Sequence, residues 1–454
     1  MRVKSPWGGV KRQVMREEKM RSNPAIARWI GVSFAVVCVL ASCTSKRVAP
    51  PPEGKTFQVP WGAVPLEIWD PTVKNTLERA IMEGLHVRLQ EHRKNAPGKR
   101  IILRGLALSG GGSHGAYGAG VLIGWTDAGT RPEFDVVTGI STGALMATAA
   151  FLGPEEDEAL RMYTRITNKD IYKSRGILAV LTGDSMYDAA PLRKLIAKQI
   201  DDRVLKAVAR EHARGRRLFV GTVNLDAQAF TIWNMGFIAS SGRPDKLERY
   251  RDVILASASV PVLFPPVYIP VEEGGESYLQ MHVDGGAREM VFFPEFIEDF
   301  GKAIAGFGLK PSDVRGEMYV LYNGRVAARG TYEPVEPRAL SIMEVFVQSL
   351  MRKNATGSIY RIWVRGLIQK MDFNLTDIPP DYQDLQRDME FNSDDMKRLF
   401  EYGYNRSVKG EAWWTQPAVD DYQELIRKLN PWNVIGEMEA RPEFRRLEMW
   451  RPKE

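Results

Sequence analysis

Short apolar segments alternate with amphipathic segments through the central part of the chain. Five of the apolar segments are predicted to form strands: Ile101–Leu108, Phe134–Thr138, Leu218–Val223, Met281–Val283 and Met318–Tyr322. Helical stretches lie between them, for example at Gly143–Phe151 and Ala190–Ile200. Strands that alternate with helices are typical of an α/β fold, so we expect a mostly parallel sheet with helices on both faces.

Helical patterns also flank this central part. Before it, apolar residues recur at near-helical spacing over residues 72–93, which predicts an amphipathic helix. After it, Leu340–Met351 and Ser393–Tyr402 have helical patterns. The proline-rich spacer Val48–Gly54 indicates an extended linker ahead of the first helix.

The first 42 residues have the pattern of an export signal. They hold eight lysines or arginines and two glutamates, and their apolar run Trp29–Ala41 is short for a membrane span. The run ends in Leu40-Ala41-Ser42-Cys43, which resembles the bacterial lipobox, where a peptidase cuts before the cysteine and the thiol is lipidated. We therefore expect a signal peptide at 1–42 and a lipid on Cys43, with an uncleaved anchor helix as the alternative.

This segment also accounts for the charge and the cysteines of the chain. It carries the whole formal net charge of +6, so the remainder is neutral and gives no indication of a nucleic-acid partner. The only two cysteines are Cys38 and Cys43, which leaves the mature chain without a pair for a disulfide. We expect a bacterial cell-envelope protein, anchored by lipid to the outer membrane and facing the periplasm, because Thr44 is not an Asp retention signal.

The strongest local motif is a serine between two glycines, Gly139-Ile-Ser141-Thr-Gly143, placed between a predicted strand and a helix of small residues. In that setting Gly-x-Ser-x-Gly is a nucleophile elbow, in which the glycines let the flanking backbones approach and the serine hydroxyl projects above the sheet. The dipole of the following helix favours negative charge on the hydroxyl oxygen. Ser141 is therefore the candidate nucleophile.

A glycine loop, Gly110-Gly111-Gly112, follows the first predicted strand and precedes a helix. Its backbone N–H groups are suited to an anion, which is either a phosphate or the oxyanion of acyl transfer. With Gly115 the loop also fits the dinucleotide fingerprint, so a dinucleotide-binding protein is a distant alternative. That fingerprint requires an acid at the end of the second strand, where this chain has the serine motif instead.

The third motif is a short predicted strand that ends in an acid and two glycines, Met281-His282-Val283-Asp284-Gly285-Gly286. Alone, Asp-Gly-Gly is a common turn. In this order, however, the glycine loop, Gly-x-Ser-x-Gly and Asp-Gly-Gly resemble the patatin-like phospholipase family over roughly residues 101–290. The segment Leu255–Pro266, with its small residues and prolines, adds to the resemblance.

The resemblance implies a serine lipid acyl hydrolase of the phospholipase or lysophospholipase type, acting on membrane lipid or another lipid ester. It implies Ser141 as nucleophile, Asp284 as base, an oxyanion hole at Gly110, Gly111 and Gly112, and a turn after the acid at Gly285 and Gly286. His114 is a departure, because the family usually has Arg or Lys there. We expect no cofactor and no metal, since the five histidines show no metal-binding spacing.

The same motifs are compatible with two other functions. A Ser-His-Asp α/β-hydrolase esterase needs a histidine after the serine and the acid in chain order, and no histidine lies beyond His282. We expect His282 to be a strand residue that faces away from the neighbours of Asp284, and His114 to be an exposed loop residue near the site. The second reading is a non-catalytic lipid-binding lipoprotein.

The motifs also predict how the chain is organised. A signal peptide at 1–42 is followed by a linker and an N-terminal helix at 43–100. A catalytic domain is expected at 101–325, with its core motifs within 106–290. Residues 326–454 are expected to form a C-terminal extension that partly completes this domain.

Overall fold

The computed structural model describes residues 47, 49–52, 63–65, 71–176, 183–273, 275–293, 304–326, 334–385 and 387–417. The predicted signal peptide, the predicted lipidation site Cys43 and residues 418–454 lie outside these ranges. Within them, no helix combines the length and the apolar character needed to cross a membrane.

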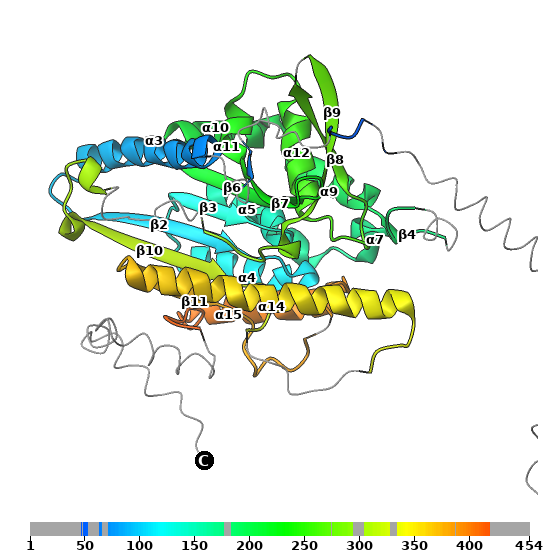
Figure 1. The fold of residues 1–454 in the computed structure, drawn as a ribbon. Coiled ribbons are helices and arrows are strands. Elements are labelled where there is room, and N and C mark those ends of the chain that lie inside the picture. Colours follow the sequence, from blue (N-terminus) through cyan, green and yellow to red (C-terminus); the bar gives the residue numbers. More distant parts are fainter. Residues whose placement is uncertain are drawn as a thin grey trace, which may run out of the picture.

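Nine strands of the described residues form one sheet around which the chain is built (Figure 1). The strands along its path are β1 (Val64–Pro65), β7 (Ala229–Asn234), β6 (Arg217–Asn224), β3 (Val136–Gly139), β2 (Ile101–Leu108), β10 (Val314–Leu321) and β11 (Asp372–Thr376). From β6 to β11 every neighbouring pair is parallel, whereas β7 and β1 are antiparallel additions at one edge. A hairpin of β8 (Val267–Glu273) and β9 (Glu276–Asp284) joins the sheet through β6.

Helices cover both faces of this sheet, as Figure 1 shows. The longer ones are α3 (Pro71–Asn95), α4 (Gly115–Asp127), α5 (Thr142–Leu152), α9 (Ala190–Gln199), α10 (Asp202–Ala213), α12 (Lys246–Ser257), α14 (Ala339–Ile368) and α15 (Ser393–Val408). The shorter elements are α6 (Asp157–Leu160), α7 (Asn168–Ile171), α11 (Met235–Ser240), β4 (Lys173–Ser174), β5 (Tyr187–Asp188) and the 3-10 turns η1 (Gly112–His114), η2 (Pro154–Glu156), η3 (Arg161–Thr164), η4 (Gly285–Ala287) and η5 (Pro311–Asp313). The predicted α/β fold with a mostly parallel central sheet is confirmed.

The apolar side chains of β2 pack alternately on the two faces of the sheet. Leu106 and Leu108 pack with α4, α5 and the helices α9–α12 in the largest core cluster. Ile101 and Leu103 point the other way and pack against α3, and Ala107 packs against α14. Because successive side chains of a strand alternate between faces, a continuous apolar run fits a strand that is covered on both sides.

The observed elements differ from the predicted ones chiefly at their ends. Strand β2 matches the predicted Ile101–Leu108, while the predicted Phe134–Thr138 is observed as Val136–Gly139. The predicted short strand Met281–Val283 is part of the nine-residue β9, which runs antiparallel to both of its partners. The helix predicted at Leu340–Met351 extends to Ile368.

Elements that follow residue 326 contribute to the same sheet and core. Strand β11 pairs in parallel with β10, and α15 packs against α4. The approach of the two helices is close, because a Cβ atom on Gly120 of α4 would lie 2.1 Å from the carbonyl oxygen of Phe400 in α15. A glycine at this position therefore lets the two backbones touch.

We predict that Gly120→Ala lowers the free energy of unfolding by about 1–3 kcal/mol, because the added methyl group has to push α15 away from α4. Urea unfolding of the full chain measures the effect. Gly242→Ala is the matched control, since no atom lies within 4 Å of a Cβ placed there. Equal stability of the two variants would show that the α4–α15 contact is looser than the structure has it.

Candidate active site

Ser141 sits in a sharp turn between β3 and α5. Its φ and ψ of 54° and −123° are a strained conformation for a residue with a side chain. The flanking glycines make the turn possible, because a Cβ on Gly143 would lie 2.3 Å from the carbonyl oxygen of Leu108 and one on Gly139 would lie 2.6 Å from that of Gly143. The strand, tight turn and helix that the Gly-x-Ser-x-Gly motif predicted are all present.

Ser257, the last residue of α12, holds this turn in place. Its hydroxyl oxygen accepts a hydrogen bond from the backbone N–H of Ser141 at 3.0 Å and donates one to the carbonyl of Gly221 in β6 at 2.7 Å. The side chain is fully buried. The sequence analysis named the segment Leu255–Pro266 only as part of the family resemblance. It predicted no role for Ser257.

The pairing of β6 explains why Asp284 lies at the level of Ser141. Strand β3 ends at Gly139, opposite Val220 of β6, and the turn then carries Ser141 away. The opposite edge of β6 is paired with β7 as far as Asn224. Strand β9 takes the place that β3 vacates, and it enters from the opposite direction to pair Asp284 with Thr222.

Asp284 is fully buried beside Ser141. One carboxylate oxygen, Oδ1, accepts a hydrogen bond from the N–H of Gly286 at 2.7 Å, which is the turn predicted after the acid. The other, Oδ2, has no partner with full hydrogen-bond geometry in the described part of the chain. Burial raises the pKa of Asp284 to about 7, although the neighbouring Ser141 hydroxyl and the Gly286 N–H both act to lower it.

The glycine loop was predicted to bind an oxyanion through Gly110, Gly111 and Gly112, and the structure differs from this prediction at Gly110. The N–H of Gly110 donates to the carbonyl of Met290 at 3.1 Å and is therefore not available to a substrate oxyanion. Gly111 and Gly112 line the cavity at Ser141, and so does Thr142, the residue after Ser141, which the sequence analysis did not single out. Within the described residues, the backbone N–H groups of these three make no hydrogen bond that would compete with a ligand.

The side chain of His282 is directed towards residues other than Ser141. His282 is fully buried, its Nδ1 lies 3.0 Å from the Thr222 hydroxyl, and burial lowers its pKa to about 3. The prediction that His282 faces away from the neighbours of Asp284 is wrong, because Thr222 is the cross-strand partner of Asp284 and alternate strand residues share a face. His114 lines the cavity but is half-buried, not exposed.

Asp135, an acid at the start of the second predicted strand, is not placed to bind the ribose of a dinucleotide. Asp135 lies just before β3, at the end of the sheet opposite to Ser141, and its carboxylate accepts from Arg88 Nε at 2.6 Å and from the backbone N–H of Arg104 at 2.7 Å. A ribose-binding acid belongs at the carboxyl end of that strand. Asp135 thus has a structural role in this chain.

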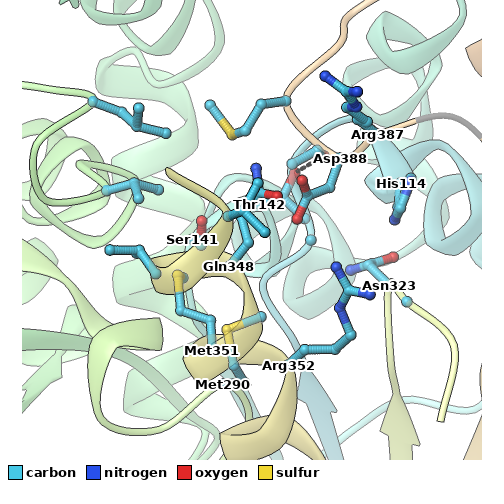
Figure 2. Close-up of a pocket in the computed structure, with 18 of the residues that line it drawn as sticks. His114, Ser141, Thr142, Met290, Asn323, Gln348, Met351, Arg352, Arg387 and Asp388 are labelled. Carbon is cyan, nitrogen blue, oxygen red and sulfur yellow. Dashed lines mark hydrogen bonds between the residues drawn. The ribbon is translucent and has the colours of Figure 1, made fainter. Parts of the chain in front are cut away.

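A cavity of about 690 Å³ opens at Ser141. One part of its wall is apolar and includes Leu145, Ile166, Ile171, Val260, Leu263 and Phe264. Another part is polar or charged and includes His114, Asn323, Arg325, Arg352, Arg387 and Asp388. Figure 2 shows His114, Asn323, Arg352, Arg387 and Asp388 gathered on one side of Ser141.

The arrangement can be compared with known proteins at this point. The family model described as patatin-like phospholipase matches residues 106–297, which span the glycine loop, Ser141 and Asp284. Residues 106–297 are a patatin-like phospholipase domain. No curated protein sequence matches the chain.

Among solved structures, the chain is similar to VipD from Legionella pneumophila, with 13% sequence identity and a TM-score of 0.29. The alignment covers 69% of this chain and 66% of the VipD chain, so this chain spans slightly less than two thirds of the length of that protein.

The patatin-like domain shows no cluster of metal ligands in its described part. Across the described residues, no group of three or more His, Cys, Asp or Glu side chains is arranged to hold a metal ion. The polar groups at Ser141 are instead a carboxylate, hydroxyls and backbone N–H donors.

The buried acid leads to a prediction about stability. The folded pKa of Asp284, about 7, lies above the value of about 4 expected in the unfolded chain, so the folded state holds this proton more tightly. The contribution of Asp284 to stability is therefore most favourable below about pH 4 and is lost as the pH rises towards about 7.

We predict that Asp284→Asn stabilises the patatin-like domain, and that the gain at pH 8 exceeds the gain at pH 5 by roughly 2–3 kcal/mol. The neutral amide keeps an oxygen for the Gly286 N–H and buries no charge. Urea unfolding at both pH values gives the difference. Asp313→Asn, in a 3-10 turn at a carboxylate that is only half-buried, is the matched control for the same chemical change. A gain that does not change with pH would mean that Asp284 is ionised throughout this range.

Proposed function

We propose that this protein is a serine lipid acyl hydrolase of the phospholipase or lysophospholipase type, with Ser141 as nucleophile and Asp284 as base. The observation that carries the proposal is a strained serine next to a fully buried carboxyl whose pKa is about 7, at the wall of a partly apolar cavity. Strained conformations of this kind cluster at active sites, where the surrounding fold maintains them.

The pKa of Asp284 matches the task of a general base. A free aspartate has a pKa near 3.9, which makes it a weak base for a serine hydroxyl. Near 7, the carboxyl is ionised in a useful fraction of molecules and binds a proton with more driving force. Burial thus supplies the basicity that a histidine supplies in Ser-His-Asp enzymes.

The proposed reaction has two steps, acylation and deacylation of Ser141. Asp284 takes the proton of the Ser141 hydroxyl as the oxygen attacks the acyl carbonyl, and the tetrahedral oxyanion is bound by the N–H groups of Gly111, Gly112 and Thr142. The C–O bond to the leaving alcohol breaks, and that alcohol receives the proton from Asp284. Water then attacks the acyl-serine ester with Asp284 again as base, which releases the fatty acid and restores Ser141.

The two parts of the cavity wall suit an amphiphilic substrate. Apolar side chains such as Ile171 and Phe264 can contact an acyl chain, and burial of the chain supplies binding energy. Cationic side chains such as Arg352 and Arg387 can approach the phosphate of a head group. These two parts of the wall support a phospholipid or lysophospholipid as the proposed substrate class.

The first test replaces the two proposed catalytic residues. Ser141→Ala and Asp284→Asn are each expected to reduce hydrolysis of a lipid ester by about 10⁴-fold or more, and the double variant to be hardly worse than either, because the pair acts as a unit. Product analysis by mass spectrometry with purified protein and a defined phospholipid or lysophospholipid measures the loss.

Two histidine variants distinguish this dyad from a histidine-based hydrolase. His114→Ala and His282→Gln are expected to keep a substantial part of the activity, because Asp284 is the proposed base and the ring nitrogens of His282 face Thr222 and Gln280. Unfolding curves confirm that each variant is folded. If His282→Gln is as inactive as Ser141→Ala while Asp284→Asn remains active, the Ser-His-Asp reading replaces the dyad. Absence of any ester hydrolysis by the wild-type chain would favour a lipid-binding lipoprotein.

We further propose that the mature protein begins at a lipidated Cys43 and is anchored in a bacterial envelope membrane on the periplasmic side. The support is the sequence alone, since residues 1–46 lie outside the described part. One acyl chain binds a membrane only marginally, so firm anchoring requires a diacylglycerol.

The lipid anchor is tested on the protein extracted from membranes. Mass spectrometry is expected to show an N-terminal peptide that starts at Cys43 and carries acyl chains, and Cys43→Ser is expected to abolish both the cleavage and the lipid. Recovery of an intact peptide spanning residues 29–43 from the wild type would contradict the lipoprotein proposal.

A further inference from the structure

The N-terminal half of α14 exposes an apolar stripe. Ile342, Phe346 and Leu350 are 53%, 57% and 55% exposed, respectively. They recur every four residues, so they lie one above another on a single face of the helix. Large apolar side chains that are more than half exposed in a contiguous row are unusual on a soluble surface and mark an interaction site.

The opposite face of the same segment is also apolar. Val347 and Met351 pack against the main core cluster of the sheet. They also line the cavity at Ser141, together with Gln348, which Figure 2 shows on this helix beside the nucleophile. A helix that is apolar on both faces is normally covered on both sides. Here the core covers one side, and the described residues leave the other side open to solvent.

The position of the stripe connects it to the cavity. In Figure 1, the yellow N-terminal part of α14 reaches past the strands of the sheet. Residues 345–353 of this part contribute to the cavity wall through Val345, Val347, Gln348, Ser349, Met351, Arg352 and Lys353. Met343, Val345 and Ser349, which flank the stripe on the helix surface, are also part of the cavity wall, so a surface that contacts the stripe lies next to the cavity.

Two cationic side chains at the end of the stripe are suited to contact the phosphate groups of a lipid surface. Arg352 and Lys353 directly follow Leu350 and Met351, and both are exposed. Lysine and arginine at the edge of an apolar helix face place their charges at the level of lipid phosphates while the apolar residues enter the acyl boundary. A protein partner would not require this order of apolar and cationic residues along the helix.

We propose that α14 docks this protein onto the surface of a phospholipid bilayer through Ile342, Phe346 and Leu350, with Arg352 and Lys353 at the phosphates. The identity of the surface rests on the proposed lipid hydrolysis, since the same segment forms the wall of the cavity that would receive the lipid. Docking brings the cavity next to the bilayer, so a lipid moves from one to the other without crossing water.

A fluorescent probe tests the docking independently of catalysis. The full chain with Ser141→Ala, Cys38→Ser and Cys43→Ser receives one new thiol, by Phe346→Cys or by Ile368→Cys, which is labelled with a polarity-sensitive dye. Ile368 is the matched control, because it is 71% exposed on the same helix, about 33 Å away at 1.5 Å per residue. Vesicles of phosphatidylcholine with phosphatidylglycerol are then added.

We expect the emission of the probe at residue 346 to shift to the blue with vesicles and the emission at residue 368 to stay unchanged. No shift at 346, or equal shifts at both positions, would overturn the proposal. Self-association without vesicles that is lost in the variant Ile342→Ser/Phe346→Ser/Leu350→Ser would also overturn it, because a second copy of the chain would then be the occupant.

The same triple variant tests the consequence for turnover. Loss of three half-exposed apolar contacts is expected to lower hydrolysis of phospholipid in vesicles by about 10- to 100-fold. Hydrolysis of a soluble short-chain ester should stay within about twofold of wild type, because none of the three side chains lines the cavity. An equal loss on both substrates would contradict docking. If the wild type hydrolyses neither substrate, the proposed function fails, and the fluorescence result still decides whether α14 binds the bilayer.

Discussion

The early end of β3 is the constraint on which the site depends. Beyond Gly139 the chain turns away into the elbow, which would leave the backbone of Thr222–Asn224 in the buried strand β6 without partners on that side. Unpaired backbone groups in a protein interior are costly, and the other edge of β6 is already paired with β7. Strand β9 pairs with these groups, and in doing so it brings Asp284 next to Ser141.

The parts of the site that could be predicted from the sequence are those set by local backbone geometry. The elbow at Ser141 depends on glycines two residues away on either side, so a short motif is sufficient to identify it. Asp284 was placed correctly beside the serine for an incomplete reason. We expected the carboxyl end of a strand in a mostly parallel sheet, whereas β9 runs antiparallel and enters from beyond the end of β6. An apolar pattern does not show the direction of a strand.

The parts that escaped prediction depend on contacts between distant segments. The N–H of Gly110 is occupied by the carbonyl of Met290, and the hydroxyl of Ser257 ties Ser141 to Gly221. No sequence motif next to the residues that make these two contacts predicts them. The length of α14 is a similar case, since its second half is helical where Ile359 and Trp363 pack against β10 and β11, a surface that forms only in the folded protein.

Burial of the acid also determines where protons can go in the proposed reaction. Asp284 is 0% exposed and Ser141 is 7% exposed, so an acyl carbonyl can reach the serine while the carboxyl stays behind it. The proton that Asp284 accepts has to return to a leaving oxygen bonded to the same carbon that the serine attacks. That oxygen is therefore already held near the carboxyl when its bond breaks. The same burial keeps bulk water from the carboxyl, which maintains its raised pKa, so the hydrolytic water has to enter by the route that the alcohol leaves.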